Sequence, residues 1–69
     1  MENLKKLRLE KNYSFNHMAK ELNISKTYYW QIEHNQRRLS YDMAIKIANI
    51  FSKKPDEIFY HEFQKTKKE

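Results

Sequence analysis

A short stretch with three adjacent aromatic residues carries the side chains whose types and spacing suggest chemistry: SKTYYWQIEHNQRR, residues 25 to 38. On a helix of 3.6 residues per turn, three successive side chains cannot all face one core. Tyr29 and Ile32, three residues apart, are expected to face inward. The outer or flanking faces then carry Lys26, Thr27 and Gln31. Glutamine pairs with adenine, lysine donates to guanine, and the threonine methyl group can touch a thymine methyl, so these three residues are predicted to read DNA base edges.

A second group of residues is expected to contact the phosphate backbone, which supplies affinity without reading sequence. Arg37 and Arg38 follow the aromatic stretch in a loop, and this place favours phosphate contact over a merely solvated loop. The other candidates for contact with phosphate or backbone are Ser14, Ser25, Tyr28, Trp30, His34, Asn35 and Gln36. For Trp30 three interpretations stay open: it lies against DNA, stacks on an arginine such as Arg38, or contacts another protein.

Five helices are predicted to position these side chains, because apolar residues recur at helical spacing without strand-like alternation. The expected ranges are about 2–11, 15–22, 26–34, 41–52 and a fifth range that begins at Pro55. The expected N-caps are Ser14, Ser25 and Ser40. The chain has no glycine, and the expected left-handed turn residues are therefore Asn12, Asn23 and Asn35. The predicted fold is all-α, with a helix-turn-helix formed by the second and third helices.

Two of these helices carry clear apolar stripes at helical spacing. In the second helix the stripe consists of Phe15, Met18, Ala19 and Leu22. In the fourth helix it consists of Tyr41, Ala44, Ile45, Ala48 and Phe51. We expect both stripes to face one shared core.

Length, charge and composition limit the class of protein. A chain of 69 residues allows one domain, expected over residues 1–63, with a basic, frayed tail over residues 64–69. The net charge of +5 favours a polyanionic partner. Cysteine is absent, which excludes disulfides and thiolate metal sites, and no apolar run approaches a membrane span. We therefore expect a cytoplasmic protein without a membrane partner.

The pattern over Leu4 to Phe59 resembles the lambda-repressor-like, Cro/XRE-type helix-turn-helix family. The residues that carry the resemblance are Leu4, Arg8, Ser14, Met18, Ala19, Leu22, Ile24, Ser25, Ile32, Glu33, Arg37, Ser40, Ala44, Ile47, Ala48 and Asp56 to Phe59. The resemblance implies a five-helix domain of the kind found in mostly dimeric, sequence-specific regulators of transcription. Phe15 stands where the family usually has a phosphate-binding glutamine, and it either extends the core or presses against the sugar-phosphate edge.

The resemblance also implies two structural contacts. Arg8 and Glu33 are expected to form an ion pair between the first and third helices. The fifth helix is expected to form a dimer interface through Ile58, Tyr60 and Phe63, unless these residues pack within one chain.

The expected function is that of a dimeric repressor or autoregulator, such as a phage or mobile-element repressor, that reads a palindromic operator in double-stranded DNA. Histidines are scattered and there is no glycine-rich phosphate loop, so we expect no enzyme activity, no metal and no cofactor. The small size leaves no room for a sensor domain, so no small-molecule ligand is expected. The alternative is a protein-interaction module on the same fold that has lost specific DNA binding.

Overall fold

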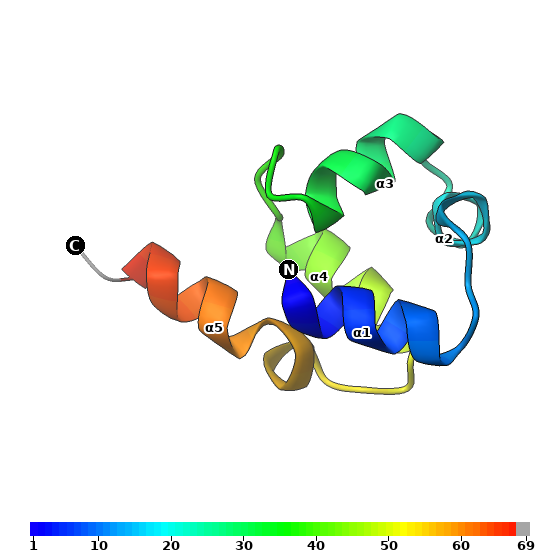
Figure 1. The fold of residues 1–69 in the computed structure, drawn as a ribbon. Helices are drawn as coiled ribbons and strands as arrows, with labels where there is room; N and C mark the ends of the chain where they lie inside the picture. Colours follow the sequence, from blue (N-terminus) through cyan, green and yellow to red (C-terminus); the bar gives the residue numbers. More distant parts are fainter. Residues whose placement is uncertain (68–69) are drawn as a thin grey trace.

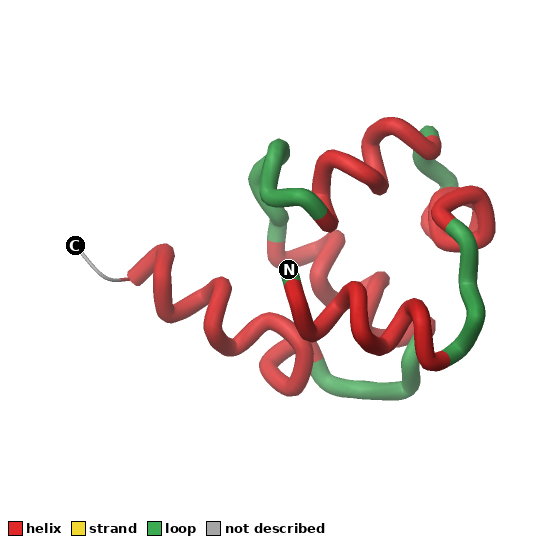
Figure 2. Tube along the Cα trace, in the orientation of Figure 1, coloured by secondary structure: helices red, strands yellow, loops and turns green. Residues whose placement is uncertain are grey.

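The computed structural model describes the backbone of residues 1–67 and the side chains of residues 1–62 and 64. It contains five helices: α1 (Glu2–Glu10), α2 (Phe15–Leu22), α3 (Lys26–Glu33), α4 (Tyr41–Ile50) and α5 (Pro55–Lys67). No strand occurs within residues 1–67 (Figure 2), and the all-α prediction is confirmed. α5 continues past residue 63, and the fraying expected for residues 64–69 stays a prediction.

Serine side chains begin the three middle helices, as the sequence predicts. The hydroxyl oxygens of Ser14, Ser25 and Ser40 accept hydrogen bonds from backbone N–H groups three residues on, at 3.0, 3.0 and 3.1 Å. Each bond satisfies a donor that the first turn of a helix leaves without a partner inside the helix. These caps fix where α2, α3 and α4 start.

Four residues other than glycine adopt the left-handed conformation. Asn12, Asn23 and Asn35 have φ of 59°, 59° and 58°, which confirms the predicted turn residues. Ser52, with φ of 56°, is a fourth one that the sequence did not indicate. α4 ends at Ile50, two residues earlier than expected, because the left-handed Ser52 cannot continue a right-handed helix.

Replacing Ser52 with asparagine is expected to raise the free energy of unfolding by about 0.5–1 kcal/mol, because asparagine tolerates the left-handed conformation better. The measurement is the urea midpoint followed by circular dichroism. The matched control is Asn12→Ser, the reverse change at an equivalent φ, which we expect to lower the midpoint. Two shifts in the same direction would show that left-handed preference does not govern these turns.

The core collects residues from all five helices. Its buried apolar members are Leu4, Met18, Ala19, Leu22, Tyr29, Ile32, Ala44, Ile47, Ala48, Phe51, Ile58 and Phe59. Both predicted stripes contribute to it, but Tyr41, at the first position of α4, is exposed. The stripe of α4 therefore begins one turn later than we expected.

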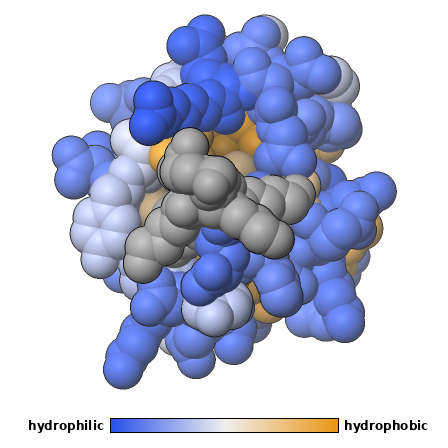
Figure 3. Space-filling view, turned by 90° about the vertical axis from the view of Figure 1, so that its left-hand side faces the viewer, coloured by the Kyte–Doolittle hydropathy of each residue, from blue (hydrophilic) through white to orange (hydrophobic). Residues whose placement is uncertain are grey.

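The helices lie so that α3 and α5 occupy different sides of the molecule (Figure 1). α2 packs against α3 and α4, while α5 packs against α1 and α4. Seen from the side of the C-terminus, hydrophilic residues cover most of the surface, with small hydrophobic areas between them (Figure 3). In the described part of the chain, no helix combines the length and the apolar character that crossing a membrane requires.

Candidate nucleic-acid interface

The turn between α2 and α3 sets the angle at which α3 is presented. Asn23 ends α2 in the left-handed conformation, and the backbone N–H of Ile24 donates to the carbonyl oxygen of Ala19 at 2.9 Å. The side chain of Ile24 packs against the core, and Ser25 then caps α3. Two short helices are thus joined by a tight turn in which backbone hydrogen bonds and apolar contact fix the geometry.

The outer face of α3 carries the side chains predicted to read bases. Lys26 and Thr27 are exposed in its first turn, whereas Tyr29 and Ile32 are fully buried. Trp30 is 40% exposed, which confirms that it is the outward member of the aromatic triplet. Gln31 and Tyr28 are half-buried on the flanks. Burial therefore divides α3 into a core face and a polar outer face, as the sequence predicts.

A buried ion pair ties α3 to α1. Arg8 Nε donates to Glu33 Oε2 at 2.8 Å and Arg8 Nη2 donates to Glu33 Oε1 at 2.9 Å, so that the pair expected from the family resemblance is bidentate. Arg8 and Glu33 are only 7% and 4% exposed. The hydroxyl of Tyr29 also donates to Glu33 Oε2, at 2.8 Å, and Arg8 Nη1 donates to the carbonyl oxygen of Tyr13 at 3.0 Å. The hydrogen bond to Glu33 raises the pKa of Arg8 above its usual range.

Phe15 covers this ion pair. The guanidinium carbon of Arg8 lies 4.2 Å from the centre of the Phe15 ring, and the same ring lies 6.1 Å from the ring of Tyr29. Phe15 is half-buried and packs against the core, in agreement with the first of its two interpretations. A phenyl ring here shields the charges from water.

Trp30 stacks on His34 at the end of α3. Their ring centres lie 3.9 Å apart with an angle of 14° between the planes, and His34 Nδ1 lies 2.9 Å from the carbonyl oxygen of Trp30. The ring that stacks on Trp30 is therefore that of His34, and not the side chain of an arginine such as Arg38, which was one of the three interpretations. Contact of Trp30 with DNA or with another protein stays a prediction. The stacked pair forms a flat aromatic surface beside the predicted base readers.

The loop after α3 reverses the chain and brings Arg37 back to the helix. Arg37 Nε donates to Gln31 Oε1 at 3.2 Å, and the guanidinium carbon lies 4.6 Å from the centre of the Tyr28 ring. Arg38, Gln36 and Asn35 are exposed in the same loop. The link between Arg37 and Gln31 was not predicted, although the turn at Asn35 is a signal that the chain reverses there.

The residues assigned to a dimer interface do not share one environment. Ile58 is 3% exposed and belongs to the core of the single chain, so its assignment to an interface was wrong. Tyr60 is 54% exposed on α5, and the side chain of Phe63 lies outside the described residues.

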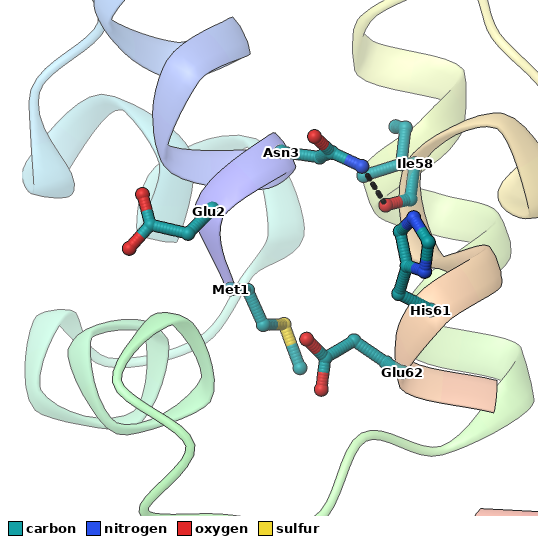
Figure 4. A pocket seen from close by; sticks show the side chains of 6 residues that line it. All are labelled: Met1, Glu2, Asn3, Ile58, His61 and Glu62. Carbon is teal, nitrogen blue, oxygen red and sulfur yellow. Dashed lines mark hydrogen bonds between the residues drawn. The ribbon is translucent and has the colours of Figure 1, made fainter. Parts of the chain in front are cut away.

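Beside α5, an open groove of about 250 Å³ runs along the start of α1 (Figure 4). Its lining residues are Met1, Glu2, Asn3, Ile58, His61 and Glu62. Asn3 Nδ2 donates to the carbonyl oxygen of Ile58 at 3.4 Å, so the groove contains a direct hydrogen bond between the two helices.

The buried hydroxyl of Tyr29 predicts a loss of stability in alkali. Burial and the hydrogen bond to Glu33 raise the pKa of Tyr29 well above its usual value near 10. Because this pKa is higher in the folded than in the unfolded state, the contribution of Tyr29 to the free energy of unfolding is complete below pH ~10. Above that pH it declines by about 1.4 kcal/mol per pH unit. Tyr29→Phe should remove this decline, as measured by urea midpoints at about pH 9 and about pH 11. The control Tyr60→Phe, at an exposed tyrosine, should show the same decline as the wild type. Equal declines in the wild type, Tyr29→Phe and Tyr60→Phe would contradict the assignment of the decline to Tyr29.

A family model described as a helix-turn-helix domain matches residues 1–60, which include α1 to α4 and the first half of α5. Neither the curated proteins nor the solved structures include a match to this chain.

Proposed function

The chain belongs to the helix-turn-helix domain family, and from this premise we propose that it is a sequence-specific regulator of transcription that places α3 in the major groove of double-stranded DNA. The second helix of this motif is the one that enters the groove, with residues near its N-terminus on base edges. In this chain that helix is α3, and its first turn carries Lys26 and Thr27. We assign base reading to these two residues and to Gln31.

The observation that carries the proposal is the arrangement of α3 and the loop that follows it. The core holds one face of α3 through Tyr29 and Ile32, and the opposite face carries polar and cationic side chains. Arg37 and Arg38 extend this face beyond the end of the helix, where a phosphate backbone lies in a helix-turn-helix complex. The net charge of +5 supports the same partner.

We further propose that the protein acts as a homodimer on a palindromic operator, as a repressor or autoregulator of the lambda-repressor-like type. Two recognition helices related by a two-fold axis read half-sites about 34 Å apart. The exposed Tyr60 supports an interface at α5, away from α3 (Figure 1). We keep Phe63 in the proposed dimer interface and leave Ile58 out of it.

The test is selection of binding sites from a random duplex library at moderate salt, followed by sequencing of the enriched pool. An enriched palindrome would support sequence-specific binding by a two-fold dimer. An unenriched pool, with binding that disappears as salt rises, would leave only general attraction to phosphate and would contradict the proposal. The protein-interaction module would then be favoured, because the Trp30–His34 surface is the aromatic area that a protein partner would use.

Gln31→Ala is expected to lower discrimination at one base position by about 1–3 kcal/mol, because a side chain that hydrogen-bonds a base edge distinguishes that base. Competition between the selected duplex and single-base variants measures this loss. The matched control is Gln64→Ala, an exposed glutamine on α5, which should leave the base profile as it is. An unaltered profile for Gln31→Ala would remove Gln31 from the base readers.

A further inference from the structure

Arg37 differs from its neighbour Arg38 in what it contacts. Arg38 makes no hydrogen bond or ring contact with Gln31 or Tyr28 among the described residues, whereas Arg37 contacts both. Its Nε–H donates to Gln31 Oε1 at 3.2 Å, and its guanidinium lies over the Tyr28 ring at 4.6 Å. The guanidinium therefore lies between an aromatic ring and the amide of a proposed base reader.

We propose that Arg37 is a positioning residue that orients the Gln31 side chain for base reading, an inference that rests on the proposed function. Arginine donates hydrogen bonds and accepts none. The amide oxygen of Gln31, and not its nitrogen, must therefore face Arg37. The NH₂ group of Gln31 is then turned away from Arg37 and is available to a DNA base.

The orientation of this amide determines which base it suits. An NH₂ group donates, and guanine presents two acceptors, N7 and O6, at its major-groove edge. The bidentate pairing of glutamine with adenine needs the amide oxygen beside the nitrogen at the base edge, whereas here the oxygen faces Arg37 and the NH₂ group alone is presented to the base. The base preferred opposite Gln31 is therefore guanine, in place of the adenine that residue type alone suggests.

Arg37 also connects this reader to the DNA backbone. Its Nε–H is directed to Gln31, which leaves the N–H groups of the two terminal nitrogens for a phosphate oxygen. A phosphate held there keeps the guanidinium against Tyr28 and the amide of Gln31 in place. Arg37 is thus expected to affect both affinity and base preference, whereas Arg38 affects affinity alone.

The test compares Arg37→Lys with Arg38→Lys on the selected duplex and on its single-base variants. In lysine the carbon Cε replaces Nε, so that the positive charge is kept but the Nε–H donor to Gln31 and the planar guanidinium are lost. Arg37→Lys is expected to lower the preference for guanine opposite Gln31 by about 10-fold. Arg38→Lys is expected to keep that preference, whatever it does to total affinity.

A double mutant separates positioning from direct contact with a base. If Arg37 acts through Gln31, then adding Arg37→Lys to Gln31→Ala should change the base profile no further. A further loss at another base position would overturn the inference in favour of direct base reading by Arg37. Tyr28→Phe retains the ring below the guanidinium and should keep the preference, while Tyr28→Ala should reduce it.

A measurement without DNA separates this inference from the proposed function. In the free protein, Arg37→Lys should shift the NMR signals of the Gln31 side-chain amide, and Arg38→Lys should not. If Arg37→Lys shifts the Gln31 amide signals but the wild-type protein selects no DNA sequence, the proposed function is contradicted. The role of Arg37 in base reading is then contradicted with it. A selective wild-type protein whose base profile survives Arg37→Lys would overturn the inference alone.

Discussion

Glu33→Ala is expected to lower the free energy of unfolding by about 3–5 kcal/mol, because it leaves a buried arginine without its counter-charge. Arg8 is 7% exposed and directs two of its nitrogens to the Glu33 carboxylate. Tyr29 loses the acceptor of its buried hydroxyl in the same variant. A loss of this size removes much of the stability of a small domain.

Urea unfolding followed by circular dichroism measures this effect. The control is Glu21→Ala, which removes an exposed carboxylate from α2 and should change the free energy of unfolding by no more than about 0.5 kcal/mol. A Glu33→Ala midpoint equal to that of the wild type would show that Arg8 finds another partner or water at no cost.

The triple variant Arg8→Met, Glu33→Leu, Tyr29→Phe tests the physical cause. It replaces all three polar groups with apolar ones, so no buried donor or charge remains without a partner. We expect it to be more stable than Glu33→Ala alone, although it removes more hydrogen bonds. A triple variant less stable than the single one would mean that the network contributes net stability by attraction, beyond the cost of leaving a charge unpaired.

The parts of the fold that were predictable from the sequence depend on local patterns. Serine caps and asparagine turns act within a few residues, so positions such as Ser25 and Asn23 could be identified without tertiary information. The inward face of α3 followed from spacing alone. The Arg8–Glu33 pair, separated by 25 residues, followed instead from the family resemblance.

The parts that were missed depend on tertiary geometry or on weak residue preferences. Serine has no strong tendency toward the left-handed conformation, so Ser52 gave no signal. Ile58 and Tyr60 lie two residues apart on α5, and the packing of α5 against α1 and α4 places Ile58 in the core and Tyr60 on the surface. The contact of Arg37 with Gln31 depends on side-chain conformations in a loop, which periodicity does not describe.

DNA affinity is expected to fall about 100-fold when monovalent salt rises from about 50 to about 200 mM. The exposed cations that we assign to phosphate near α3 are Arg37 and Arg38, since Lys26 is assigned to a base edge. The two subunits of a dimer then neutralise about four phosphates, and a plot of the logarithm of affinity against the logarithm of salt concentration has a slope near about −3.5 because bound counterions are released. Fluorescence anisotropy with the selected duplex at several salt concentrations measures this slope.

Arg38→Ala identifies the source of this salt dependence. It removes one phosphate contact per subunit, so the slope for a dimer should become shallower by about 2. The matched control is Lys53→Ala, an exposed cation in the loop between α4 and α5, on the side away from α3 (Figure 1), which should leave the slope as it is. A change of about 1 would indicate that one subunit binds at a time. Equal changes for Arg38→Ala and Lys53→Ala would mean that net charge, and not the surface around α3, attracts the DNA.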